Sequence, residues 1–231
     1  QERRAGIPKQ GGRPLQSARL RCKTRAYYLT ATLPKMPPRF FCPELPAQPG
    51  DFPLPAGAAH HAVRVLRLRY GEAVAIFDGQ GLEYEGELIE LAAKPGVRLH
   101  RRVVSQREAP LAVTLVQALA VADKMDWIVQ KAVELGATRV QPVEAERSVL
   151  KLAGDRAGKR LQHWQQIAIS AAEQCGRSHL CELAPIERLS RWLNQPFDGE
   201  RWILAPEGGE KLSALERPTG SLALLIGPEG G

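Results

Sequence analysis

The sequence predicts an α/β protein with a small amino-terminal β-barrel and a carboxy-terminal domain built on a mostly parallel sheet. From Phe40 to about residue 105, short apolar or alternating runs are separated by turns rich in Gly and Pro, which is typical of a small barrel. After Pro110, apolar runs alternate with amphipathic stretches, which is typical of βαβ units. We therefore place the barrel at residues 36–106 and the α/β domain at residues 107–231.

Three strands are expected in the amino-terminal domain. The stretches EAVAIFDG, residues 72–79, and EYEGELIEL, residues 83–91, flank a turn with the sequence Asp-Gly-Gln-Gly. Such a turn between two β-like runs predicts a hairpin. The stretch VRLHRRVV, residues 97–104, is a third candidate strand.

The first elements of the carboxy-terminal domain form a predicted βαβ unit. LAVTLVQALA, residues 111–120, is a continuous apolar run, as expected for a strand covered on both faces. Asp123 is expected to cap the next helix, which Gly136 ends, and TRVQPV, residues 138–143, is the second strand. The helix has an apolar stripe formed by Met125, Ile128, Val129, Ala132 and Leu135.

The alternation continues to the end of the chain. A helix is expected at residues 157–175 and a shorter one at residues 187–193. Strands are expected at residues 180–186, 201–205 and 221–226. The tryptophans of the two longer helices, Trp127 and Trp164, are expected in the core.

Composition narrows the class of protein. No apolar stretch approaches the roughly 20 residues that a membrane helix needs. The four cysteines form no C-x-x-C pair and no metal-ligand spacing is present, so we expect reduced thiols in a cytoplasmic protein and no metal. Two thiols lie at Cys22 and Cys42, two at Cys175 and Cys181.

The net charge of +7 is concentrated in the first 35 residues. That segment holds nine of the 32 Lys and Arg residues and one of the 25 acids, so the remaining residues carry a net charge of −1. Because residues 1–35 show no amphipathic period, we interpret them as a disordered or non-native leader before Met36. Any nucleic-acid interface must then rest on local basic clusters.

Two similar loops follow predicted strands. Residues 204–209 read LAPEGG, and residues 225–231 read LIGPEGG. In parallel sheets, ligands bind beyond the carboxyl ends of strands, and glycine lets the backbone approach a ligand closely. Each loop has Glu where a phosphate-binding loop would have a cation, so the pattern favours an uncharged or cationic ligand. Two plain tight turns are the alternative interpretation.

The sequence resembles the RsmE-type small-subunit ribosomal RNA uridine-N3 methyltransferases of the SPOUT superfamily. The resemblance rests on LLIGPEGG, DKMDWIVQKAVELGATRVQPVEAERSV, HWQQIAISAAEQCGRS, PRFF and HHAVRVLRLRYGE, in this family's spacing, and extends from Met36 to Gly231. It implies a PUA-like barrel, an α/β domain with a trefoil knot, a homodimer, and S-adenosylmethionine as cofactor. It also implies methyl transfer to N3 of a uridine in 16S ribosomal RNA.

The resemblance also implies a set of cofactor-binding residues on the two loops. Relatives continue past the last glycine pair through a segment that completes the knot and encloses the adenine, and that segment is absent from this sequence. If the molecule ends at Gly231, we expect weak or absent cofactor binding and little activity. The implied cofactor-binding residues are Leu204, Ala205, Pro206, Ile226, Gly227, Pro228, Glu229, Gly230 and Gly231.

Basic residues provide candidates for RNA binding and for chemistry. Arg39, His60, Arg64, Arg67 and Arg69 form an acid-free group suited to phosphate contacts, although a solvated helix face has the same composition.

Three further residues are candidates for catalysis. Removing the imide proton of uridine requires an acceptor and a cation for the resulting anion. Glu173 could accept the proton, and Arg147 or Arg177 could stabilise the anion; ordinary helix-end ion pairs are the alternative for each.

Two other functions remain open from the residues. The chain could be a non-catalytic RNA-binding protein with a degraded cofactor pocket. It could also be a carboxylate enzyme that uses Glu207 and Glu229, which would need the two carboxylates close together.

Overall fold

The computed structural model describes residues 36–104, 107–146, 152, 154–205 and 208–228. The predicted leader, residues 1–35, lies outside the described residues. Within the described ranges, no helix is long and apolar enough to cross a membrane.

The amino-terminal domain is a five-stranded sheet with strand order β1-β3-β4-β5-β2. β1 pairs with β3 in parallel, and the other neighbours are antiparallel. A short helix, α1 (Ala56–His60), continues into a π-helical turn, η1 (His61–Val65). The strands are β1 (Arg39–Phe41), β2 (Asp51–Pro53), β3 (Ala73–Phe77), β4 (Glu83–Leu91) and β5 (Lys94–Val103).

The predicted hairpin joins β3 and β4. Asp78 stabilises the turn, because its Oδ1 accepts the backbone N–H groups of Gln80 at 2.7 Å and Leu82 at 3.0 Å. Phe40 and Tyr84 are fully buried in the core of this domain. The expected third strand is also present, as β5.

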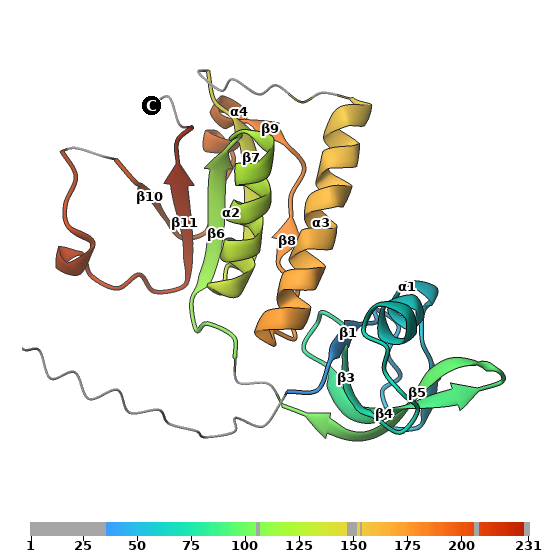
Figure 1. The fold of residues 1–231 in the computed structure, drawn as a ribbon. Helices are drawn as coiled ribbons and strands as arrows, with labels where there is room; N and C mark the ends of the chain where they lie inside the picture. The colour runs from blue at the N-terminus through green and yellow to red at the C-terminus, as the bar shows by residue number, and fades with distance from the viewer. Residues whose placement is uncertain (1–35, 105–106, 147–151, 153, 206–207, 229–231) are drawn as a thin grey trace, which may run out of the picture. The chain divides into compact units, whose positions relative to one another are not determined.

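The carboxy-terminal domain is a parallel sheet with strand order β10-β11-β6-β7-β8, and β9 pairs with the end of β7 (Figure 1). The strands are β6 (Ala112–Ala118), β7 (Arg139–Glu144), β8 (Glu182–Leu183), β9 (Glu187–Arg188), β10 (Glu200–Ile203) and β11 (Ser221–Ile226). The helices are α2 (Ala122–Glu134), α3 (Asp155–Cys175), α4 (Leu189–Leu193) and the 3₁₀ turn η2 (Leu212–Ala214).

Helices cover the two faces of this sheet unequally. α2 and α3 lie on one face, where Met125, Val129 and Trp164 are fully buried against β6, β7 and β8. On the other face, α4 packs Trp192 against Val143 and its neighbours on the sheet. The part of the first face over β11 carries no helix from the described ranges (Figure 1).

Four expectations about this domain are wrong in detail. Trp127 is 61% exposed and Leu135 is 84% exposed, because both point away from the face of α2 that packs on the sheet. Val121, not Asp123, is the N-cap of α2, and Asp123 lies in the first turn, where a carboxylate interacts favourably with the helix dipole. The strand expected at residues 180–186 is short because Pro185 follows β8 and lacks a backbone donor.

Candidate functional site

The two glycine-containing loops leave the same edge of the sheet side by side. β10 and β11 are parallel neighbours, with Ile203 opposite Leu225, and Leu204 donates its N–H to the Leu225 carbonyl at 3.0 Å. The prediction that the two loops follow adjacent strands is therefore confirmed for the described residues at the ends of β10 and β11. The loop residues Pro206, Glu207, Glu229, Gly230 and Gly231 lie outside the described residues.

An apolar groove of about 670 Å³ runs between α2 and the uncovered face of β6 and β11. Its volume lies within the range typical of small-molecule sites, roughly 300–1,000 Å³. Ile226, Gly227 and Pro228 line the groove where β11 ends. A Cβ placed on Gly227 would meet no atom within 4 Å, so the backbone here faces open space. Apolar walls beside accessible backbone suit a nucleoside such as the adenosine part of S-adenosylmethionine.

The groove includes three of the expected cofactor residues but not all of them. Leu204 and Ala205 are exposed and do not line it. On the sheet the groove is lined by Val113, Leu115, Gln117 and Leu224; on α2 it is lined by Lys124, Trp127, Ile128, Lys131, Ala132 and Leu135.

The basic group of α1 and η1 is exposed on the amino-terminal domain. His60, Arg64, Arg67 and Arg69 are all exposed, and none forms an ion pair with an acid in the described ranges. Arg67 has a φ of 55°, a left-handed conformation that is uncommon for a residue with a side chain. These four side chains are accessible to an RNA backbone.

Arg39 does not belong to this exposed group. Its side chain is 4% exposed and forms an ion pair with the buried carboxylate of Glu83. The Nη2 group of Arg39 donates to the Arg177 carbonyl at 3.1 Å, and the guanidinium carbon lies 4.9 Å from the centre of the Phe77 ring. Arg39 is therefore buried between the two domains and has a structural role, and its contact with RNA phosphate stays a prediction.

Arg177 is also a buried structural residue. Its Nη1 donates to the carbonyl of Val133 in the last turn of α2 at 3.1 Å and to that of Ala137 just beyond the helix at 2.7 Å. Its Nε and Nη2 donate to Oε2 of Glu108 at 3.0 and 2.7 Å. Burial raises the pKa of Glu108, but the hydrogen bond and charge of Arg177 outweigh it and the net pKa is lowered. These bonds give Arg177 a structural role.

Glu173 lies in the same joint between the domains. Its Oε1 accepts the backbone N–H of Phe41 at 3.0 Å, so it links α3 to β1. Burial raises its pKa, and the Phe41 hydrogen bond and the charges of His61 and Arg39 lower it only in part.

The position of α3 separates Glu173 from the loops. α3 follows β7 in the chain and runs antiparallel to it for 21 residues. Its last turn is therefore about 30 Å from its first turn and lies near the amino ends of the strands. Within one chain, Glu173 and Arg177 therefore lie far from the ends of β10 and β11, and their catalytic role stays a prediction. The third candidate, Arg147, lies outside the described residues.

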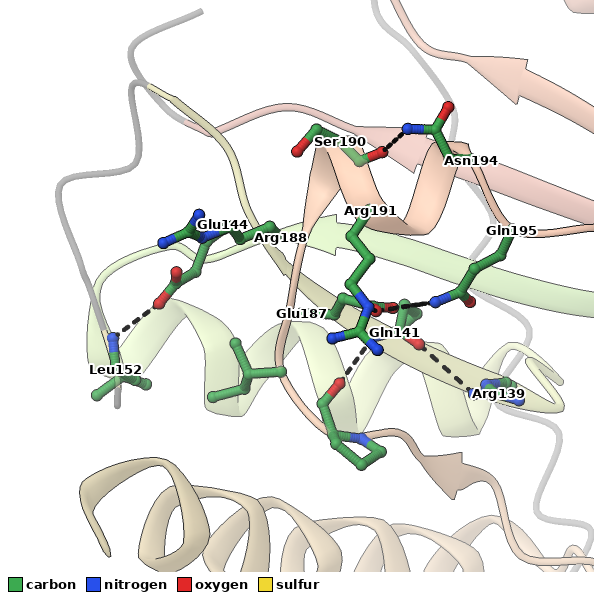
Figure 2. A pocket seen from close by; sticks show the side chains of 12 residues that line it. Arg139, Gln141, Glu144, Leu152, Glu187, Arg188, Ser190, Arg191, Asn194 and Gln195 are labelled. Carbon is green, nitrogen blue, oxygen red and sulfur yellow. Dashed lines mark hydrogen bonds and ion pairs between the residues drawn. The ribbon is translucent and has the colours of Figure 1, made fainter. Parts of the chain in front are cut away.

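A second, polar cavity of about 970 Å³ lies beside β7, and sequence reasoning missed it (Figure 2). We call it the β7 cavity. Its polar residues are spread over β7, β9 and α4 in no recognisable motif, so the sequence carried no signal for it. It is lined by Arg139, Gln141, Glu144, Leu152, Pro185, Ile186, Glu187, Arg188, Ser190, Arg191, Asn194 and Gln195.

Comparison with known proteins identifies the class of this fold and site. Residues 107–231 match the family model of an RNA methyltransferase domain, and residues 54–98 match that of an RNA methyltransferase PUA domain. The chain is thus an RNA methyltransferase by fold and sequence.

Individual relatives narrow the class further. The chain is 32% identical over 190 residues to the ribosomal RNA small subunit methyltransferase E of Bacillus subtilis, covering 78% of this chain and 74% of that protein. It resembles a crystal structure of the Neisseria gonorrhoeae methyltransferase E bound to S-adenosyl methionine, with a TM-score of 0.77 and 35% identity over 84% of this chain and 81% of that one. A Legionella pneumophila putative methyltransferase in complex with the same cofactor gives a TM-score of 0.78 and 30% identity, with the same coverage. The chain belongs to the ribosomal RNA small subunit methyltransferase E family.

Proposed function

We propose that this chain transfers the methyl group of S-adenosylmethionine to N3 of a uridine in 16S ribosomal RNA. The observation that carries this proposal is the groove beside Gly227, which opens at the end of β11 in a fold shared with cofactor-bound relatives. The bound cofactor supplies a methyl group on a positively charged sulfonium. An apolar groove beside backbone groups, without a phosphate-binding cation motif, fits such a ligand.

The proposed cofactor residues combine described and undescribed positions. Ile226, Gly227 and Pro228 would contact the ligand from the end of β11, and Leu204 and Ala205 from the neighbouring loop. We keep Pro206 and residues 229–231 in the set, because they continue the same two loops. The role of these residues is to bind and orient the ligand, since alignment of methyl group and acceptor is the main task of such a protein.

The proposed RNA-binding residues are His60, Arg64, Arg67 and Arg69. This assignment is supported by the exposure of the four side chains, which have no acidic partner in the described ranges. The arginine charges are therefore available for phosphate groups. Arg147 is retained as a candidate for stabilising the uridine anion, because the segment that contains it follows the carboxyl end of β7.

The finer points of the resemblance are also proposals. We propose a domain boundary near residues 106–107, a trefoil knot in the second domain, and action in the cytoplasm. The family matches at residues 54–98 and 107–231 support the boundary.

We further propose that the enzyme acts as a homodimer. Its support is the outer wall of the groove, where Trp127 and Leu135 are large apolar side chains left exposed on one helix. Monomeric proteins rarely expose large contiguous apolar patches, and such patches commonly mark interaction sites.

Two measurements test the main proposal. Equilibrium dialysis with labelled S-adenosylmethionine should show binding, and mass spectrometry of small-subunit RNA incubated with protein and cofactor should show one added methyl group on a uridine. RNA binding without cofactor binding would instead favour a non-catalytic RNA-binding protein. Methylation of a different base, or at a different uridine atom, would contradict the assignment to N3.

A further inference from the structure

The β7 cavity has a polar lining, in contrast to the apolar groove on the other face of the sheet. Figure 2 shows Arg188 and Glu144 toward one end of the cavity and Arg139 toward the other. Nine of the twelve lining residues are polar or charged, three of them arginines. The volume of about 970 Å³ suits a ligand of nucleotide size.

The two carboxylates of the cavity are already engaged by neighbouring groups. Both oxygens of Glu187 accept hydrogen bonds from Gln195 Nε2, at 2.8 and 3.0 Å, and Arg191 Nε lies 3.0 Å from Oε1. Glu144 Oε1 accepts the backbone N–H of Leu152 at 3.1 Å. These acids are therefore partly neutralised or hydrogen-bonded within the protein.

Two of the three arginines retain capacity for a ligand. Arg188 is exposed and forms no ion pair with any acid that the structure describes. Arg139 is 42% exposed, and its side-chain contacts with the described residues are long ones of 3.5 Å, to Glu182 and Gln141. The cavity therefore offers guanidinium groups to an anion, and guanidinium groups bind phosphate oxygens well.

The end of the cavity that contains Glu144 and Arg188 lies at the edge of the sheet where the cofactor loops begin. Glu144 ends β7, and Arg188 pairs with it in register on β9. In the strand order, β7 is two positions from β11 and β9 lies one position beyond β7, so Arg188 lies on the order of 14 Å across the edge from the loop at Gly227. An extended RNA strand that continues from the acceptor base can span such a distance.

We propose that the β7 cavity binds a phosphate of the RNA substrate near the methylated nucleotide, with Arg188 as the cation; Arg139, at the other end of the cavity, is too far along β7 to share that phosphate. This proposal rests on the proposed function, because it assigns a further contact to the same RNA substrate. Arg188 would be a binding residue that fixes the strand beside the cofactor loops.

The test compares RNA binding by Arg188→Ala, Arg188→Lys and the wild-type protein over a range of salt concentrations. Loss of one phosphate contact lowers the slope of log K against log salt concentration by about 0.7 for single-stranded RNA. We expect Arg188→Ala to bind more weakly with this smaller slope, and Arg188→Lys to keep the wild-type slope. Arg217→Ala is the matched control, since Arg217 is an exposed arginine before the amino end of β11.

Three outcomes would overturn the proposal. An unchanged slope for Arg188→Ala would exclude an RNA phosphate at this residue. An equal loss in Arg188→Ala and Arg217→Ala would indicate a general charge effect. Binding of inorganic phosphate that depends on Arg188, with unchanged RNA binding, would identify a site for a free anion. Cofactor binding is measured on the same samples, so a failure of the proposed function appears as wild-type protein that does not bind S-adenosylmethionine.

Discussion

Arg177 connects three segments of the chain through one guanidinium group. It donates to two carbonyls at the carboxyl end of α2 and to the carboxylate of Glu108, while its own carbonyl accepts a bond from Arg39. A buried charge of this kind is costly unless all of its partners are present. The joint between the two domains therefore depends on complete pairing.

The first prediction concerns removal of this charge. Arg177→Met leaves Glu108 and two carbonyls without their donor, so we expect the free energy of unfolding to fall by about 3–5 kcal/mol. Urea denaturation at neutral pH measures the change. Arg191→Ala is the control, because the exposed pair Arg191–Glu187 should contribute less than about 1 kcal/mol. Equal effects of the two changes would contradict the structural role of Arg177.

The second prediction uses the raised pKa of Glu173. Because the folded protein binds the Glu173 proton more tightly than the unfolded chain, stability falls as pH rises from the ordinary pKa of 4.5 through the raised value. Glu173→Gln removes this loss, so the melting temperature of the variant relative to wild type should be higher at pH 7 than at pH 4. An oxygen of Gln can still accept the Phe41 N–H. A constant difference between pH 4 and pH 7 would show that Glu173 titrates normally.

At the scale of elements, the end of β11 determines which ligand can approach. A Cβ added to Gly227 would point into open space, and the backbone of Gly227 is not in the left-handed conformation. An added methyl group is therefore compatible with folding but occupies volume beside the groove. This separates an effect on binding from an effect on stability.

The third prediction follows from that separation. Gly227→Ala should change the free energy of unfolding by less than about 0.5 kcal/mol, as for a surface substitution. It should weaken S-adenosylmethionine binding about tenfold or more, measured by calorimetry. Gly158→Ala on α3, also in open space, is the control and should leave cofactor binding unchanged. Wild-type affinity in Gly227→Ala would place the cofactor elsewhere.

The fourth prediction concerns the basic surface of α1 and η1. Replacing Arg64 and Arg69 together by alanine should reduce the slope of log K against log salt concentration for RNA by about 1.4, if each contacts one phosphate of a single strand. Cofactor binding should not change, since both residues lie outside the cofactor domain. If the variant binds RNA as tightly as wild type at every salt concentration, this surface is an ordinary solvent-exposed face that does not contact RNA.

At the scale of the whole molecule, the apolar wall of α2 predicts association. Trp127→Asp and Leu135→Asp should each convert a dimer into a monomer, because a charge cannot be buried in an apolar interface without a partner. Light scattering coupled to size-exclusion chromatography measures the mass. Leu212→Asp is the control, since Leu212 is 73% exposed on a different element. A wild-type protein that is monomeric at micromolar concentration would contradict the homodimer.

Local patterns in the sequence determined much of this protein. Apolar periodicity located β4 and β11 at their observed bounds and α2, α3 and α4 within about two residues, but it did not predict α1; alternation and helical spacing are properties of consecutive residues. Proline and glycine after apolar runs located the loops, and the parallel sheet then placed β10 and β11 side by side. The resemblance to the family came from the same local stretches.

Only the tertiary structure decided which polar and aromatic side chains are buried. Arg39, Glu173 and Arg177 are residue types that are common in functional sites. In the structure, however, they contact residues far away in the sequence and join two domains. Trp127 is a large apolar residue of the type usually found in a core, yet its side chain is exposed. The β7 cavity gathers residues from separate elements. Burial and pairing depend on which distant segments meet, and no short stretch of sequence contains that information.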